Sequence, residues 1–510
     1  MDAAHQKAVL SRSVADGIFG TIWTSLAGGA FLVGYALKIF HADSRVIGAL
    51  AALPLMANVV QVAGAILIER TGRIKPISIA GVTAGRLAWL GVILLPLVLA
   101  HGAPPASWPL IAAIGVSSLF AAVGSVGWTA WMGDLVPAKR RGAFFGRRNM
   151  IASVAGMAAM LLGGRFLDSA ARWGIPVRIA FAGLFAVGLL CGMVSVWFLS
   201  RLPETGTARA APARHAEGSL ILRPLRDANF RTLILSVCAW SVAIQMAGPF
   251  YSVFLIDALR ADFGTITLFG TCATVATLLM MRTWGPISDR HGNRPVIVVS
   301  SWVLAVVPVL WVIARPGAYF LPVLLANLVS GAAMAGAALS QFNILIKLSP
   351  REGRSMYIAV FSALTGLVGA AAPLAGGLAV RALHGLSLTV LSFHLSSLHL
   401  LFLASSLIQA VSILPALRIR EPAATAPSAV LLQLKNDLNP QTGIASSADF
   451  VLLEVRRGRR VLREVDRRTE RLARMSERRI SVIADRLGSA TAGIRARLRR
   501  YLQDTYDDAG

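Results

Sequence analysis

Acidic and basic residues gather at a short pattern that occurs twice in the chain, each time between two long apolar segments. The two copies are Glu69-Arg70-Thr71-Gly72-Arg73 and Asp289-Arg290-His291-Gly292-Asn293-Arg294. Glycine permits the backbone angles of a tight turn, and a carboxylate beside arginines can form an ion pair or bind the positive N-terminus of a neighbouring helix. The pattern therefore favours a polar contact between neighbouring helix ends. The alternative interpretation is that these charges only shape the loops and orient the chain in a membrane.

The segments that must position these charges are long and apolar. Of the 510 residues, 55% are hydrophobic and 15% are charged, whereas a soluble globular protein carries about a quarter charged residues. This composition excludes an ordinary soluble enzyme and a disordered scaffold. Because roughly 20 apolar residues cross the ~30 Å hydrocarbon core of a bilayer, we predict an all-α integral membrane protein with twelve transmembrane helices. Their expected limits are 17–40, 45–68, 76–100, 108–133, 144–169, 176–200, 230–256, 263–286, 295–314, 317–347, 355–382 and 390–416.

The distribution of Lys and Arg predicts that both termini are cytoplasmic. With that orientation, the inner segments up to residue 416 hold 22 Lys and Arg and the outer segments hold 8. Cytoplasmic loops of membrane proteins carry such an excess, which also explains much of the net charge of +25. We expect a monomer in the cytoplasmic membrane and no nucleic-acid partner.

The two halves of the chain repeat. Pro137 and Arg141 recur as Pro350 and Arg354, at an offset of 213 residues. Small residues allow close helix packing in membranes, and one glycine triplet recurs at the same offset: Gly156, Gly163 and Gly164 match Gly369, Gly376 and Gly377. The expected organisation is a cytoplasmic N-terminus (1–16), a six-helix half (17–200), a central cytoplasmic loop (201–229), a second six-helix half (230–416), a linker (417–450) and a basic tail (451–510).

The twelve spans, the repeat and the acidic pattern resemble the major facilitator superfamily of secondary transporters over residues 17–416. The motif of that family between spans two and three is G-x-x-x-D-R-x-G-R-R/K. The second copy here, from Gly285 to Arg294, matches it well, whereas the first copy has Ala65 and Glu69 in place of the leading glycine and the aspartate. The resemblance implies two six-helix pseudo-repeats that move a small solute by alternating access. It also implies a cytoplasmic latch, with Asp289 and Arg354 in one half and Glu69 and Arg141 in the other.

Arg86 is the only charged residue near the middle of a predicted span. Charges inside spans are functional candidates by default, but a guanidinium stays protonated and cannot carry a coupling proton. Arg86 can pair with an anionic substrate or with a carboxylate from a neighbouring span end, or it can have a structural role. No Asp or Glu falls at a predicted midplane, so a coupling proton or cation has no obvious central site.

Neutral polar and aromatic residues are the other candidates for contact with a solute. The resemblance implies that spans 1, 2, 4, 5, 7, 8, 10 and 11 line the cavity. Buried amides must find hydrogen-bond partners in a bilayer, so these residues either contact substrate or join helices, and the tryptophans can also be interface anchors. Together they predict a polar but largely uncharged cavity. The candidates are Trp23, Thr24, Asn58, Gln61, Ser125, Trp128, Trp131, Gln245, Tyr251 and Asn343.

Enzymatic chemistry has no support in the sequence. Cys191, Cys238 and Cys272 have no metal-ligand spacing, and no phosphate-binding loop or nucleophile–base arrangement is present. We predict no catalytic site, no metal site and no cofactor.

The segment from Val451 to Leu502 has a helical pattern of apolar residues and contains 16 Arg and six acidic residues, a net charge of +10. A basic amphipathic helix is attracted to anionic lipid headgroups, which is the favoured interpretation. A coiled-coil partner helix and nucleic-acid binding are the alternatives. The tail also supports a rival hypothesis, a transporter-like sensor or tethering protein. Deletion of the tail would distinguish the two hypotheses, because a sensor would lose its output whereas a transporter would keep its flux.

Overall fold

A computed structural model describes residues 3–98, 107–136, 141–204, 223–350, 354–386, 388–390 and 393–437. The chain forms two compact units, residues 1–431 and 432–510, and the first unit holds all the spans. Twelve helices in the described residues are long and apolar enough to cross a membrane, which confirms the predicted number. They are Val9–Phe40, Ser44–Ile68, Ile74–Pro96, Trp108–Trp128, Phe144–Arg172, Val177–Ser200, Ala228–Ala258, Phe263–His291, Asn293–Val312, Phe320–Leu348, Met356–Ala382 and Ser397–Arg418.

Several spans consist of two helical pieces. The first six spans contain α1 (Ala3–Leu26), α2 (Gly29–Phe40), α3 (Ser44–Ala57), a 3-10 turn (Asn58–Val60), α4 (Gln61–Thr71), α5 (Ile74–Leu87), α6 (Trp89–Val98), α7 (Trp108–Leu135), α8 (Arg141–Arg172) and α9 (Val177–Ser200). The last six contain α11 (Ala228–Val253) with a π-helical turn (Phe254–Ala258), α12 (Phe263–His291), α13 (Asn293–Val312), α14 (Phe320–Leu348), α15 (Arg354–Ala382), α16 (Ser397–Val411) and α17 (Ile413–Arg418).

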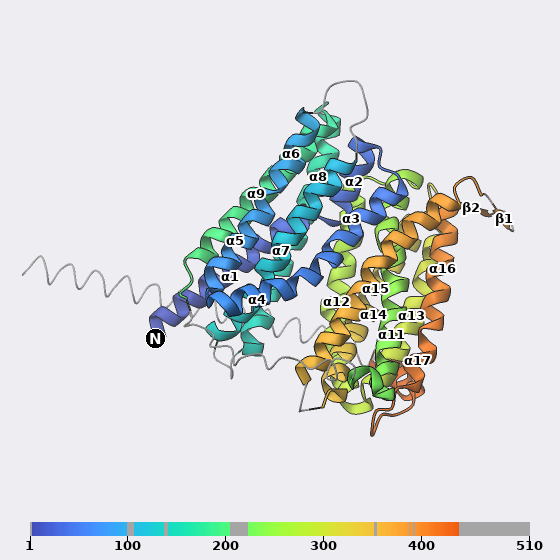
Figure 1. Cartoon of the computed structure of the whole chain (residues 1–510). Coiled ribbons are helices and arrows are strands. Elements are labelled where there is room, and N and C mark those ends of the chain that lie inside the picture. Colours follow the sequence, from blue (N-terminus) through green and yellow to red (C-terminus); the bar gives the residue numbers. More distant parts are fainter. Residues whose placement is uncertain are drawn as a thin grey trace, which may run out of the picture. The chain divides into compact units, whose positions relative to one another are not determined.

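The two sets of six spans pack in the same way (Figure 1). In the first set α1 packs against α8 and α9, and α5 packs against α7. In the second set α11 packs against α15 and α16, and α13 packs against α14. The two sets meet through α3 against α15 and through α8 against α12. This pairing is the structural form of the repeat in the sequence.

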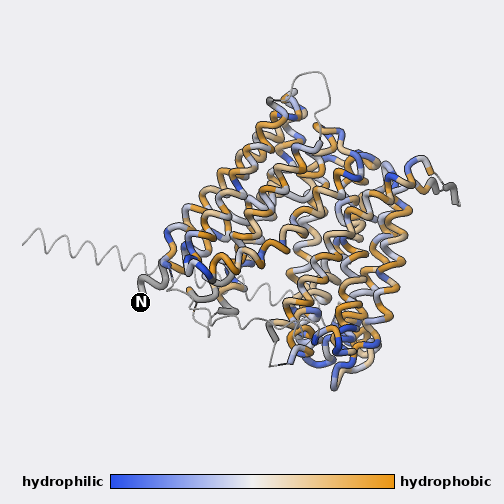
Figure 2. Tube along the Cα trace, viewed as in Figure 1, coloured by the Kyte–Doolittle hydropathy of each residue, from blue (hydrophilic) through white to orange (hydrophobic). Residues whose placement is uncertain are grey.

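Apolar residues run along the spans, and polar residues concentrate at their ends (Figure 2). Large apolar side chains such as Leu162, Leu190, Leu321 and Leu407 are exposed on the protein surface. In water such surfaces would promote association, whereas the lipid of a bilayer covers them. We refer to the end at which α1 begins as the inner end and to the opposite end as the outer end, after the orientation that the loop charges predict.

The start of the twelfth span differs from the expected position at residue 390. Two short strands, β1 (Leu388–Val390) and β2 (Phe393–Leu395), form an antiparallel pair there. The helix begins only at Ser397, where Ser396 and His399 form a capping box. The segment 388–395 alternates apolar and polar residues in several places, which favours a strand. Because the segment is also largely apolar, the sequence prediction began the span too early.

Part of the expected linker is ordered. Residues after the last span contact the start of α13 through Glu421 and the end of α12 through Thr425, and Pro427–Asp437 forms helix α18. The remainder of the linker and the basic tail, residues 438–510, lie outside the described residues.

Candidate functional site

A carboxylate of the first half binds the first turn of a helix in the second half at the outer end. Asp168 of α8 accepts hydrogen bonds from the backbone N–H groups of Phe263 (2.9 Å) and Gly264 (2.7 Å) at the start of α12. The first N–H groups of a helix lack intrahelical partners, and the helix dipole favours negative charge there. Asp168 therefore joins α8 to α12.

A second connection at the outer end is an ion pair. Arg381 near the end of α15 donates to Asp43 Oδ2 at 3.1 Å, and Asp43 is the N-cap of α3. Burial raises the pKa of Asp43, but the N–H of Val46 and the guanidinium groups of Arg45 and Arg381 outweigh it, so its pKa lies below the ordinary Asp value. The carboxylate is therefore ionised at neutral pH.

Two glycines of the repeated triplets allow the halves to approach at these connections. A Cβ at Gly164 would collide with Phe263 and Thr267 of α12, and a Cβ at Gly377 would collide with the backbone of Ser44. Ser44 Oγ also donates to the Gly377 carbonyl at 2.9 Å. In the described residues, the hydrogen bonds that we find between the two sets of spans lie at the outer end. These contacts join the two halves at the outer end in this structure.

A cavity of about 410 Å³, which we call the central cavity, lies between the two halves. Its polar wall includes Trp89, Ser117, Ser118, Gln245 and Ser252. Trp89 Nε1 donates to Ser117 Oγ at 3.1 Å, and Ser117 Oγ donates to a backbone carbonyl of α5. No Asp, Glu, Lys or Arg is among the described residues that line it, so a solute there would meet neutral hydrogen-bonding groups.

The backbone around the central cavity is irregular. Pro54, Pro249 and Pro373 lie inside α3, α11 and α15 and line the cavity. Because proline has no N–H, each removes one intrahelical hydrogen bond. The first span also breaks there, between α1 and α2, where Gly29 has a φ of 54°. Non-helical backbone at membrane depth is tolerated where it lines a cavity, and interrupted helices form the solute sites of many transporters.

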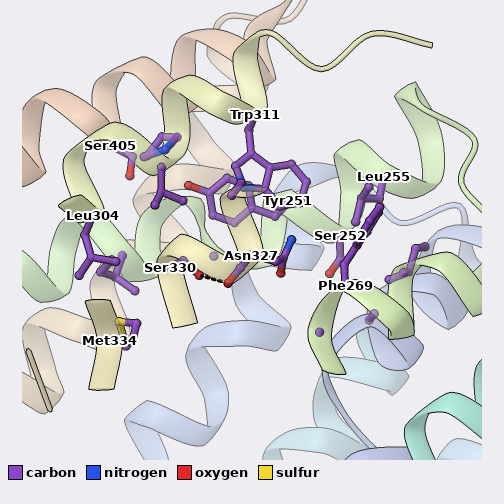
Figure 3. Close-up of a pocket in the computed structure, with 18 of the residues that line it drawn as sticks. Tyr251, Ser252, Leu255, Phe269, Leu304, Trp311, Asn327, Ser330, Met334 and Ser405 are labelled. Atoms are coloured by element: carbon purple, nitrogen blue, oxygen red, sulfur yellow. Dashed lines mark hydrogen bonds between the residues drawn. The ribbon is translucent and has the colours of Figure 1, made fainter. Parts of the chain in front are cut away.

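A second cavity, of about 330 Å³, lies mainly within the last six spans, and we call it the C-half cavity. Gly248 and Ser252 of α11 line both cavities. The Tyr251 ring stacks on Trp311 and Phe402 with ring centroids 4.5 and 4.7 Å apart. Figure 3 shows the Tyr251 and Trp311 rings between Ser405 on one side and Ser252 on the other, with Asn327 and Ser330 nearby.

Two of the predicted cavity residues line these cavities. Gln245 lines the central cavity, and Tyr251 lines the C-half cavity. Trp23 is buried beside the central cavity. Its ring is edge-on to that of the cavity-lining Trp89, with the ring centroids 5.2 Å apart. Asn343 is half-buried on α14 and lines neither cavity.

The other predicted cavity residues have partners within the first half. Thr24 is exposed and donates to the Thr21 carbonyl, and Gln61 donates to Asn58 at 2.9 Å. Trp131 is buried, and its Nε1 donates to the Pro203 carbonyl at 3.0 Å. Ser125 donates to the Ala122 carbonyl one turn earlier, and Trp128 lies under the guanidinium of Arg148, 4.9 Å from ring to Cζ.

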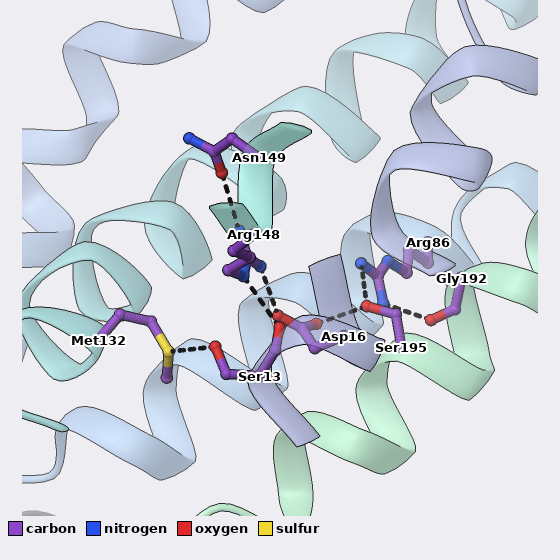
Figure 4. A network of polar contacts seen from close by, with 8 residues as sticks. All are labelled: Ser13, Asp16, Arg86, Met132, Arg148, Asn149, Gly192 and Ser195. Atoms are coloured by element: carbon purple, nitrogen blue, oxygen red, sulfur yellow. Dashed lines mark hydrogen bonds and ion pairs between the residues drawn. The ribbon is translucent and has the colours of Figure 1, made fainter. Parts of the chain in front are cut away.

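Arg86 belongs to a buried polar network in the first half (Figure 4). It donates to the Gly192 carbonyl and to Ser195 Oγ. Ser195 donates to Asp16 at 2.7 Å, and Asp16 forms an ion pair with Arg148 at 3.0 Å. The carboxylate and guanidinium of that pair are more than 90% buried. The network joins α1, α5, α8 and α9, and Arg86 lines neither cavity.

Sequence reasoning did not single out the network or its main acid. Asp16 lies at a predicted span end, and Ser195 is a single serine in an apolar helix. Arg148 lies in a basic cluster that the excess of Lys and Arg in cytoplasmic loops already explains. The isolated charge of Arg86 was the one available indication, since a buried guanidinium needs a counter-charge or hydrogen-bond acceptors.

The two acidic patterns form the expected turns. Gly72 ends α4 with a φ of 65°, and Gly292 precedes α13 with a φ of 92°. Asp289, Arg70, Arg73 and Arg290 are exposed. The side chains of Glu69, Arg141 and Arg354 lie outside the described part of the structure.

The buried carboxylate beside the second pattern is Glu421, which sequence reasoning missed because it lies in the expected linker. It accepts from Asn293 Nδ2 (2.9 Å), from the Arg294 N–H (2.7 Å) and from Lys347 Nζ (3.0 Å). Burial raises the pKa of Glu421, but these three donors outweigh it, so its pKa lies below the ordinary Glu value. Glu421 therefore fixes the chain after the last span to the start of α13.

Solved transporter structures share this fold. A mutant of the nucleoside transporter NupG has a TM-score of 0.64 and 14% identity, covering 81% of this chain and 100% of that chain. An inward-facing, unoccupied bacterial homologue of the human lysosomal transporter Spinster has a TM-score of 0.59 and 14% identity, covering 83% and 100%. A D-xylose–proton symporter has a TM-score of 0.58 and 14% identity, covering 84% and 99%.

The sequence itself matches a family model. No match is found among curated protein sequences. The model described as Major Facilitator Superfamily matches residues 17–256 and 233–462, which together include eleven spans entirely and most of the first. The chain therefore belongs to the Major Facilitator Superfamily and is a multi-pass transmembrane transporter rather than an enzyme.

Proposed function

We propose that this transporter moves a small, uncharged, hydrogen-bonding solute across the cytoplasmic membrane by alternating access. The observation that carries the proposal is the central cavity between the halves, whose described lining contains neutral polar groups and no charged side chain. A charged solute in a low-dielectric site needs a counter-charge, whereas a neutral solute needs only hydrogen-bond partners. Gln245, Ser118 and the backbone near Pro249 supply them.

The contacts at the outer end support alternating access. Asp168 and Arg381 hold that end together, and a solute in the central cavity would therefore enter and leave from the inner end in this state. Separation of these contacts, with closure at the inner end, would expose the cavity to the other side. Rocking of two repeats about a central site is the general mechanism of such folds.

We further propose that the two acidic patterns close the inner end in the alternate state. The exposed position of Asp289 fits a latch that is open while the outer end is closed. In that account Asp289 pairs with Arg354, and Glu69 pairs with Arg141. A transport rate and an inward-to-outward balance that are unchanged in Asp289→Asn would contradict it.

Orientation and coupling complete the proposal. The excess of basic residues in the inner loops supports cytoplasmic termini, and the basic tail would bind anionic lipid headgroups. We propose secondary active transport driven by a proton or cation gradient. Flux measured with and without each imposed gradient tests the coupling, and vesicles with and without anionic lipid test the tail.

Two solved structures with this fold are named for nucleosides and for D-xylose, and both are uncharged hydrogen-bonding solutes. They suggest the compounds to screen first. A ligand that binds the folded protein raises its thermal stability by mass action. We expect stabilisation of the purified protein by a nucleoside or a sugar, and little by organic acids or cationic drugs.

The variants Gln245→Leu and Asn343→Leu make the screen specific. Both replace a membrane-embedded amide, but only Gln245 lines the central cavity. The proposal predicts loss of solute stabilisation in Gln245→Leu and its retention in Asn343→Leu. Stabilisation by anions alone would show that the solute class is wrong.

A further inference from the structure

The C-half cavity reaches helices that lie behind the central cavity. It is formed by α11, α12, α13, α14 and α16, with Ala30 and Met160 contributed by the first half. Gly248 and Ser252 separate it from the central cavity, because they line both. A solute in the central cavity therefore lies one helix away from a second cavity.

A buried glutamine without partners lines this cavity. Gln409 of α16 is 1% exposed, and neither its Nε2 nor its Oε1 has a hydrogen-bond partner. A buried amide without partners is strongly unfavourable, and the surrounding bilayer offers it no water. The carboxamide therefore lies in the cavity wall with its donor and its acceptor unpaired, and a rotation of the side chain would present both to the empty volume.

Nearby polar groups are already engaged. Ser405, one turn before Gln409, donates to the Ala243 carbonyl at 2.8 Å. Asn327 Nδ2 donates to the Val323 carbonyl at 2.9 Å, and Ser330 Oγ donates weakly to the Asn327 carbonyl at 3.4 Å. These bonds leave Gln409 as the residue in the cavity wall whose donor and acceptor both lack partners.

The remaining wall suits a flat, apolar molecular face. Tyr251 and Trp311 stack in the cavity lining, and Leu255, Leu304 and Met334 complete it. No charged side chain is among the described lining residues. Pockets of this kind hold ligands mainly by apolar contact, with a few polar groups that determine orientation.

We propose that the C-half cavity binds an uncharged planar solute whose adjacent N–H and C=O groups pair with the carboxamide of Gln409. A cis-amide, as in a lactam or a carboxamide, offers one donor and one acceptor in the geometry that matches a glutamine side chain, and glutamine pairs with nucleic-acid bases in this bidentate manner. The inference deepens the proposed solute-binding function and depends on it. It assigns a specificity-determining role to the twelfth span.

A bound water molecule is the competing occupant. A buried water needs two to four polar partners, and the carboxamide of Gln409 would supply two of them. A water would satisfy Gln409 without any preference for an amide. The two occupants therefore predict different responses to one pair of compounds.

The experiment uses the full-length protein in nanodiscs, with binding measured by calorimetry. The probe is quinolin-2-one, a planar lactam, and its matched partner is 1-methylquinolin-2-one, which lacks the N–H donor. The test variant is Gln409→Leu. The control is Gln341→Leu, because Gln341 also has a buried Nε2 without a partner but does not line the C-half cavity.

Four results support the proposal. Quinolin-2-one binds the wild type at least tenfold more tightly than its N-methyl partner does. Gln409→Leu loses at least tenfold in affinity for quinolin-2-one, and Gln341→Leu keeps it. The N-methyl compound binds the wild type and Gln409→Leu equally. Without ligand, Gln409→Leu melts at a higher temperature than the wild type, because the variant removes an unpaired buried amide.

Other results would overturn it. These are equal binding of the two compounds, no binding of quinolin-2-one to the wild type, or unchanged affinity in Gln409→Leu. A lower melting temperature for ligand-free Gln409→Leu would instead indicate a water-satisfied structural glutamine. Transport of a neutral solute that remains unchanged in Gln409→Leu would reject this assignment and leave the proposed transport function standing.

Discussion

Asp168 and Arg381 hold equivalent positions in the two halves, 213 residues apart, and each one connects its own half to the start of a helix in the other. Asp168 binds the backbone N–H groups at the start of α12. Arg381 binds Asp43, the N-cap of α3. One side chain binds a helix start directly and the other binds it through a capping carboxylate, so the repeat uses opposite charges for the same closure.

The two connections should differ in strength, and Asp168 should be the stronger. The Arg381–Asp43 pair is partly exposed, and exposed ion pairs contribute about 0–1 kcal/mol. Asp168 makes two charge-assisted hydrogen bonds, which contribute about 1.5–3 kcal/mol each. We expect Asp168→Ala to favour outer opening by about 100-fold or more and Arg381→Ala to favour it less than about fivefold.

The measurement is the labelling rate of a cysteine at Ser118 in the central cavity, by an impermeant maleimide added from outside to a protein without its native cysteines. Arg172→Ala is the control, because Arg172 is an outer arginine that bonds Ser169 of its own helix. Equal labelling in Asp168→Ala and Arg172→Ala would contradict the closure assigned to Asp168.

Alanine at Gly164 or Gly377 should also oppose closure of the outer end. Each added methyl would meet backbone atoms of the other half, and overpacking costs about 1–3 kcal/mol. We expect faster labelling at Ser118→Cys in both variants. Gly146→Ala and Gly366→Ala are matched controls on the same two helices, because a Cβ there meets open space. A labelling rate that rises equally in the controls would exclude a steric cause.

The buried network around Asp16 should govern stability rather than affinity for solute. Asp16→Asn leaves Arg148 buried without its counter-charge, and breaking a buried pair costs about 3–5 kcal/mol. Arg86→Lys keeps the charge but loses the fork that reaches Gly192 and Ser195. We expect a large loss of thermal stability for Asp16→Asn and a smaller one for Arg86→Lys. If Arg86→Lys changes the dissociation constant for solute while thermal stability is retained, Arg86 contacts the solute instead.

Glu421 should stabilise the inner end of the second half at pH values above the ordinary pKa of Glu. Because its pKa is lower in the folded protein than in the unfolded chain, its contribution is complete above about pH 5 and decreases as the pH falls through the lowered value. Glu421→Ala should cost roughly 2 kcal/mol at pH 7.5 by leaving buried donors unpaired. The difference from wild type should be equal at pH 7.5 and 5.5 and should shrink near pH 3. A difference that grows on acidification would contradict this assignment.

The spans and the glycine repeat could be predicted because each has a local cause. Apolar length determines a span, and Gly164 and Gly377 were visible as a repeat before any contact was known. The partners of Asp16, Arg148 and Glu421 could not be predicted, since they depend on which helices pack together. Gln409 is a further case: its span has no distinctive pattern, and only the packed structure reveals that its amide has no partner.

Solute counterflow tests the central claim most directly. Proteoliposomes loaded with the neutral solute that stabilises the protein are placed in labelled solute, and uptake is compared with that of protein-free liposomes. The account predicts uptake that unlabelled solute competes away and that Gln245→Leu reduces at least tenfold. A wild-type protein that binds the solute but shows no counterflow, or counterflow that is unchanged in Gln245→Leu, would contradict transport through the central cavity.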